Sequence, residues 1–84
     1  MACNSIRKVT YDNANDVLYV NFIPHRMAYG DEYGGVVLMR DMDTDEVIGL
    51  TIFNPKSHPR EREKDLIDVA NTVGFDFNLN QVSF

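Results

Sequence analysis

The chain has 84 residues, of which 44% are apolar and 25% are charged, a length and composition that indicate one small folded domain and exclude an intrinsically disordered chain. Eight Lys and Arg residues against 13 Asp and Glu residues give a net charge of −5, which disfavours binding to nucleic acids and to anionic membranes. We therefore predict a single domain over residues 1–84, with neither nucleic acid nor membrane as its partner.

Two strands are predicted near the start of the chain. In residues 6–11, Ile6, Lys8 and Thr10 alternate with Arg7, Val9 and Tyr11, and residues 17–23 are rich in β-branched and aromatic side chains, which is typical of strands. Residues 12–16 between them are Asp-Asn-Ala-Asn-Asp, whose side chains bond to the nearby backbone and favour a turn. A hairpin is expected here.

Two further strands are predicted over residues 36–41 and 47–53, with a tight turn at 42–46. Pro24 ends the second strand because proline cannot donate to the sheet ladder. The connection from Pro24 to Gly35 is then the longest one in the sheet region, which covers about residues 6–53.

One amphipathic helix is predicted over about residues 58–73. Its apolar residues recur at helical spacing on one stripe, with Val69 at the edge of that stripe: Leu66, Ile67, Ala70 and Val73. Ser57 is the expected N-cap, and Gly74 stands where a helix ends in a left-handed residue.

Residues 75–84 are predicted to form a short C-terminal strand or an extended tail, because Phe75, Phe77 and Leu79 alternate with polar residues. A terminal strand can pair with its own sheet, extend the sheet of a partner or exchange between two copies. Together the elements predict an α+β fold: an antiparallel sheet of about four strands in a β-hairpin meander, then the helix and this tail.

The strands and turns also resemble a known family. The resemblance is carried by Tyr11-Asp12-(x3)-Asp16-Val17-Leu18-Tyr19-Val20, Gly35-Val36-Val37-Leu38 and Glu46-Val47-Ile48-Gly49-Leu50-Thr51-Ile52. Over roughly residues 8–53 the chain is similar to the bacterial family called domain of unknown function 2283. It departs from the family pattern in a longer loop over residues 24–34 and in lacking the usual glycine before the fourth strand. The resemblance implies a compact, hairpin-rich domain with no activity, cofactor or catalytic residue to transfer, and some similar proteins look like partners of small toxin-like proteins.

The turn carboxylates do not predict a metal site. Asp41, Asp43 and Asp45 alternate as in the first half of a calcium loop. The sixth position of that loop is Glu46 in place of glycine, however, and the twelfth is Ile52, which cannot supply a carboxylate. A solvated turn that is rich in acidic residues explains the same three aspartates without a metal ion.

No catalytic constellation is predicted either. Asp12 and Asp16 could form an acid–base pair, but capping of their turn needs the same two residues. His25 and His58 each border a proline and have no metal ligand at the usual spacing, and Cys3 near the chain start is poorly placed as a nucleophile. We expect no cofactor, no metal and no catalytic residue.

The strongest functional signal is a set of side chains of the types enriched at binding hot spots. Most of the set lies in the connection 24–35 and the rest in the tail, and the predicted interaction surface is His25, Arg26, Met27, Tyr29, Tyr33, Phe75 and Phe77. The alternative for the connection is a compact loop that packs its own side chains over a sheet edge.

The leading functional hypothesis is a small non-enzymatic interaction module, a homodimer or an antitoxin-like partner of a small basic protein. The alternative is a small-ligand-binding or weakly hydrolytic enzyme that uses the 24–35 loop, which requires a pocket of several hundred Å³ beneath that loop. The single cysteine and the absence of an apolar leader in residues 1–8 favour a cytoplasmic location.

Overall fold

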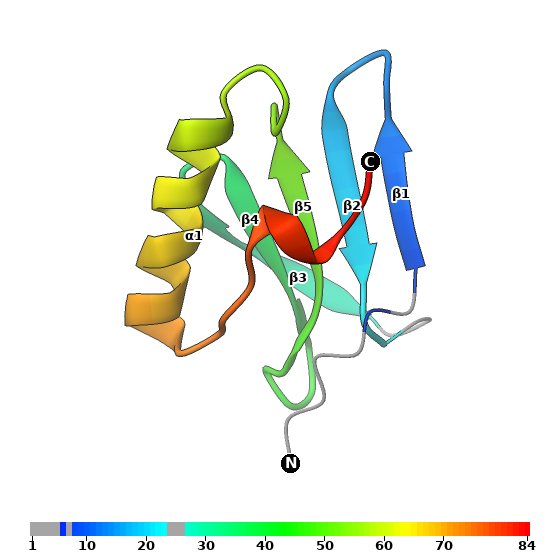
Figure 1. Cartoon of the computed structure of the whole chain (residues 1–84). Helices are drawn as coiled ribbons and strands as arrows, with labels where there is room; N and C mark the ends of the chain where they lie inside the picture. The colour runs from blue at the N-terminus through cyan, green and yellow to red at the C-terminus, as the bar shows by residue number, and fades with distance from the viewer. Residues whose placement is uncertain (1–5, 7, 24–26) are drawn as a thin grey trace.

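The computed structural model describes residue 6, residues 8–23 and residues 27–84. Within this described part, five strands form one antiparallel sheet that is followed by a helix and a 3-10 turn (Figure 1). The strands are β1 (Lys8–Asp12), β2 (Val17–Asn21), β3 (Ala28–Tyr33), β4 (Val36–Asp41) and β5 (Val47–Phe53). The helix is α1 (Pro59–Val73), and the 3-10 turn is η1 (Leu79–Gln81). The predicted α+β class, antiparallel sheet and single following helix are confirmed.

The strand order is β1-β2-β5-β4-β3, so β5 inserts between the two hairpins and the sheet departs from a simple meander. β5 has no charged side chain, which suits a central strand that is paired on both edges. The edge strands β1 and β3 carry charges, among them Lys8 and Glu32, and β4 carries Arg40 and Asp41 at its end.

β3 is the strand that the sequence did not predict, because it lies in the segment expected to be a loop. It pairs along its whole length with β4, from Ala28 opposite Asp41 to Tyr33 opposite Val36. Gly34 adopts a φ of 63° in the two-residue connection, a conformation that glycine reaches without strain. The polar sequence of β3 fits an edge strand.

One face of the sheet carries the hydrophobic core and is called the covered face. α1 packs against β3 and β4 on this face, and the residues after α1 pass over the other half of it (Figure 1). On α1, Leu66 and Val69 are buried, whereas Ile67 is 59% exposed, so the apolar stripe is rotated towards Val69. The buried core consists of Leu18, Val20, Phe22, Val36, Leu38, Leu50, Ile52, Leu66, Val69 and Phe77.

The two ends of α1 differ in how well they were predicted. Gly74 ends the helix with a φ of 79°, as expected. The N-cap residue is His58, not Ser57, and Pro59 occupies the first helical position. Ser57 does not cap the helix because its hydroxyl donates a hydrogen bond to Asp16, 2.6 Å away.

Of the two predicted alternatives for the C-terminal segment, a short strand or an extended tail, the structure has the tail. Phe75 and Phe77 both lie edge-on to Phe22, with ring centroids 5.6 and 6.4 Å away. A capping box between Asn78 and Gln81 starts η1. No helix in the described part of the chain combines the length and the apolarity needed to cross a bilayer.

Candidate functional site

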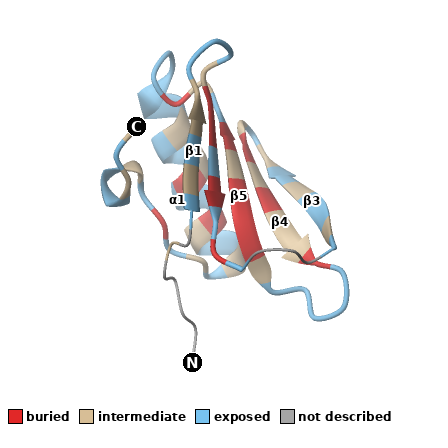
Figure 2. Ribbon diagram, turned by 90° about the vertical axis from the view of Figure 1, so that its right-hand side faces the viewer, coloured by how far each residue is buried: buried red, intermediate tan, exposed pale blue. Residues whose placement is uncertain are grey.

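No described part of the chain covers the face of the sheet opposite the core, and we call this face the open face. Figure 2 shows α1 and the tail on one side of the sheet, with no described helix on the other. The strand register arranges its side chains in three rows that run across the strands. The middle row is Thr10, Tyr19, Thr51, Val37 and Glu32; the lower row is Lys8, Asn21, Gly49, Met39 and Gly30; the upper row is Asp12, Val17 and Phe53.

The centre of the open face is apolar. Tyr19 and Phe53 are 39% and 41% exposed, and Val37 and Met39 are half-buried beside them. The charged residues of the three rows stand on the two edge strands. Aromatic and methionine side chains in the middle with charges around them are the composition of a protein–protein interface.

The sequence of β4 is consistent with a strand that is covered on both faces. Val36, Val37, Leu38 and Met39 form a continuous apolar run, which is typical of such strands. Val36 and Leu38 are fully buried against α1 and the tail, but Val37 and Met39 lie on the face that the described chain leaves open.

Sequence reasoning missed these residues, although the run in β4 and the aromatic side chains of Tyr19 and Phe53 were visible signals. It placed the interaction surface in the 24–35 connection and in the tail. His25 and Arg26 lie outside the described residues.

The other predicted residues of the connection lie on β3 or directly before it. Met27 is 78% exposed, and Tyr29 is 40% exposed. Tyr33 is half-buried against the core, and its hydroxyl donates to Asp31, 3.1 Å away. The structure thus brings Met27, Tyr29 and Tyr33 together along one edge strand.

The predicted tail residues are on the covered face. Phe77 is 6% exposed and belongs to the core, and Phe75 packs against that core beside it. Both side chains therefore pack within the chain itself.

A polar network fastens β3 to the rest of the sheet. Arg40 Nε lies 3.1 Å from Asp31 Oδ2, and its Nη1 donates to the carbonyl of Asp45 at 2.9 Å. The Tyr29 hydroxyl donates to Asp45 Oδ1 at 2.6 Å, and this bond is the main cause that raises the pKa of Tyr29. These contacts hold the segment as a strand in place of the predicted loop.

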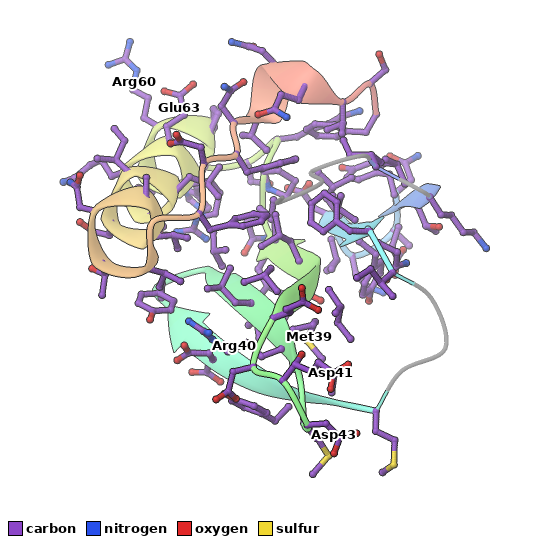
Figure 3. All side chains as sticks on the ribbon, turned by 90° about the horizontal axis from the view of Figure 1, so that it is seen from below. Met39, Arg40, Asp41, Asp43, Arg60 and Glu63 are labelled. Atoms are coloured by element: carbon purple, nitrogen blue, oxygen red, sulfur yellow. The ribbon has the colours of Figure 1, made fainter. Side chains whose placement is uncertain are left out.

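Among the three calcium-like carboxylates, Asp41 caps the turn between β4 and β5. Asp41 is 2% exposed and accepts from the backbone N–H of Asp43 at 2.7 Å and of Thr44 at 3.2 Å. Figure 3 labels Asp41 and Asp43 at this end of β4. Among the described residues, no three His, Cys, Asp or Glu side chains gather in a group that could hold a metal ion. The turn is acidic and exposes Met42, which is 57% accessible.

Asp12 and Asp16 have separate structural roles. Asp12 caps its own turn by accepting from the N–H groups of Ala14 and Asn15. Asp16, at a φ of 53°, reaches across to the loop before α1. Its carboxylate accepts from the Tyr11 hydroxyl, the Ser57 hydroxyl and N–H, and the Lys56 N–H. Both carboxylates thus stabilise local structure, Asp12 in its own turn and Asp16 between that turn and the loop before α1.

The pKa values around Asp16 reflect this bonding. Desolvation raises the pKa of Asp16, but the hydrogen bonds from Ser57, Tyr11 and Lys56 together lower it to about 2. The same carboxylate, through its hydrogen bond first, raises the pKa of Tyr11 to about 12.

A cleft of about 360 Å³ lies between the β3–β4 turn and the start of α1, lined by Gly34, Gly35, Glu61, Arg62, Lys64 and Asp65. Arg62 Nε is 3.1 Å from Asp65 Oδ2, an ion pair in which the N–H does not point at the oxygen. Arg62 Nη1 also donates to the Phe53 carbonyl, and the Gly35 N–H donates to Asp65. The cleft has the volume that the enzymatic alternative requires, but these charged groups bond to each other and to the backbone and so hold α1 on the turn.

Substitution of Gly35 by alanine is expected to lower the free energy of unfolding by about 1–3 kcal/mol, because the new Cβ would overlap the Arg62 guanidinium. Urea denaturation measures the change. Gly30→Ala is the matched control, since its Cβ meets only a Val37 side-chain atom at 3.0 Å. Equal losses for the two variants would show that the Arg62 contacts contribute little to stability.

Comparison with known proteins identifies a family and nothing closer. No curated protein and no solved structure matches the chain. The model of one family matches residues 8–56, which include all five strands and the whole open face and exclude α1 and the tail. The chain therefore belongs to the family described as "Protein of unknown function (DUF2283)".

Proposed function

We propose that this chain is a non-enzymatic protein-interaction module whose binding surface is the open face. The observation that carries the proposal is the apolar centre of that face, where Tyr19 and Phe53 are 39% and 41% exposed. Apolar surface in water costs about 25 cal/mol per Å², and a contiguous patch of it marks an interaction site more often than an inert surface.

The size of the open face suits a partner. Five strands at a spacing of about 4.8 Å and a rise of about 3.3 Å per residue give a face of roughly 24 by 20 Å. This flat area is about 480 Å², so an interface of standard size, in which each partner buries roughly 800 Å², would also include residues at the rim of the face.

If the chain has an antitoxin-like role, its small basic partner would be attracted to the acidic β4–β5 turn and not to the open face. The β4–β5 turn exposes Asp43 and Glu46 together with Met42, and Met27 is exposed beside it through the hydrogen bond from the Met42 N–H to the Met27 carbonyl. Binding there would weaken as salt screens the carboxylates. A cytoplasmic location remains a prediction from the sequence.

Photo-crosslinking tests the proposal. A benzophenone amino acid in place of Tyr19 is expected to form a covalent adduct with a second polypeptide in the source cell, because the benzophenone group would lie in the interface. The same amino acid in place of Ile67, which is 59% exposed on α1, is the control and should give no such adduct. Absence of an adduct at position 19, or equal adducts at both positions, would refute the open face as the binding surface.

A further inference from the structure

We infer that the open face is covered by a second copy of this chain, with a twofold axis that runs across the strands along the middle row, Thr10-Tyr19-Thr51-Val37-Glu32. The inference rests on the proposed function, since it takes the open face as the binding surface and names its occupant. Two copies of one face can meet only if the twofold axis lies in the plane of the interface, and sheets then stack about 10 Å apart with their strands nearly aligned.

The axis determines which residues meet. It places each strand over the same strand of the second copy with the direction reversed, so the upper row of one copy lies over the lower row of the other. Residues of the middle row meet their own counterparts, Tyr19 with Tyr19 and Thr51 with Thr51.

The charges support this axis. Lys8 and Asp12 are at opposite ends of β1, so each Lys8 would lie opposite Asp12 of the second copy. The twofold axis makes two such pairs of opposite charge. An axis parallel to the strands would instead stack β1 on β3. That arrangement leaves Lys8 over Gly30 and brings the carboxylates of Asp12 and Glu32 towards each other.

The side-chain sizes support it as well. Phe53 of one copy would lie over Gly49 of the other, which contributes no side chain, between Asn21 and Met39. A phenyl ring beside a methionine sulfur is a favourable contact. Val17 of one copy lies in the same way over Asn21 of the other.

A second copy fits the open face better than a basic partner does. Its three rows of described residues carry one lysine and two carboxylates, although the whole chain has a net charge of −5. The remaining acidic charge therefore stands away from this contact, so two acidic chains can meet here with little repulsion.

The first experiment compares two charge insertions. Sedimentation equilibrium of the full chain is expected to give a dimer for the wild type and for Ile67→Asp, while Phe53→Asp raises the dimer Kd about 30-fold or more. Both variants place one carboxylate at an exposed apolar residue, and circular dichroism checks that both fold. A wild type that stays monomeric, or a Phe53→Asp dimer of unchanged Kd, would overturn the inference.

The second experiment tests the axis. Lys8→Glu should raise the dimer Kd about 3- to 10-fold at low salt, whereas Lys64→Glu on α1, which makes the same charge change, should leave it unaltered. In a Cys3→Ser background, a short bismaleimide should join two Thr51→Cys chains but not two Ile67→Cys chains. A dimer that is indifferent to Lys8→Glu and does not cross-link through position 51 would overturn this axis.

The photo-adduct at Tyr19 separates the two levels of the proposal. An adduct with the mass of two copies supports both. A monomeric wild type whose adduct contains another protein overturns the second copy and leaves the interaction module standing. A monomeric wild type with no adduct overturns both.

Discussion

Replacing Phe77 by alanine is expected to lower the free energy of unfolding by about 3–5 kcal/mol, the usual cost of removing a large aromatic side chain from a core. Phe77 is 6% exposed and packs against Phe22, so the substitution leaves a cavity under the tail. A domain of this size has a total stability of about 4–13 kcal/mol, and the loss would be a large share of it. Urea denaturation measures the effect.

Two neighbouring substitutions are controls for this prediction. Phe75→Ala removes a half-buried ring against the same Phe22 and should cost less, and Ile67→Ala removes an exposed side chain and should cost little. A loss below about 1 kcal/mol for Phe77→Ala would mean that the tail does not complete the core. The tail would then be free to exchange with a second chain, an alternative that the alternation of residues 75–79 left open.

Docking of the tail bears directly on the function. Because Phe77 and the residues around it cover the half of the sheet that α1 does not reach, the covered face is complete within the described chain. On the opposite face Tyr19 and Phe53 stay 39% and 41% exposed, and this is the face on which we propose that a partner binds.

Local signals were enough to predict most of the elements. A few neighbouring residues are enough to indicate the β-branched runs of β2, β4 and β5 and the left-handed Gly74 after α1. β3 could not be predicted in this way, because Gly30, Asp31 and Glu32 are typical of a loop. Pairing with β4 and the contact of Arg40 with Asp31 make it a strand, and both involve residues outside β3 itself.

The candidate surface was harder to predict than the fold for a similar reason. Alternation shows that Tyr19 and Phe53 point away from Leu18 and Ile52, but it does not show which of the two faces α1 and the tail will cover. The prediction of Ser57 as the N-cap of α1 was wrong for a comparable reason, because the Ser57 hydroxyl donates a hydrogen bond to Asp16, which lies 41 residues earlier.

Replacing Asp16 by asparagine is expected to lower the thermal midpoint of unfolding by several degrees at neutral pH. In the wild type, the two carboxylate oxygens of Asp16 accept four hydrogen bonds, from the Tyr11 hydroxyl, the Lys56 N–H, and the hydroxyl and N–H of Ser57. Asparagine has only one acceptor oxygen, because its amide NH₂ group cannot accept hydrogen bonds, so the variant loses some of these bonds. These bonds join the β1–β2 turn to the loop that starts α1. Asp12→Asn is the matched control, since asparagine can also cap a turn and the change of charge is the same.

The pH dependence distinguishes this carboxylate from the other acidic groups. The pKa of Asp16 falls from 3.8 to about 2 in the folded chain, so its contribution to stability is present above pH 4 and is lost as the pH falls towards 2. Tyr11, whose pKa rises from 10.0 to about 12, has the opposite behaviour: its contribution is complete below pH 10 and is lost as the pH rises to 12. Thermal melts should therefore show that Asp16→Asn flattens the acid limb of the stability curve and that Tyr11→Phe flattens the alkaline limb. If the acid limb of the Asp16→Asn variant is as steep as that of the wild type, the four hydrogen bonds do not stabilise the ionised carboxylate. The junction between the first hairpin and α1 would then depend on packing alone.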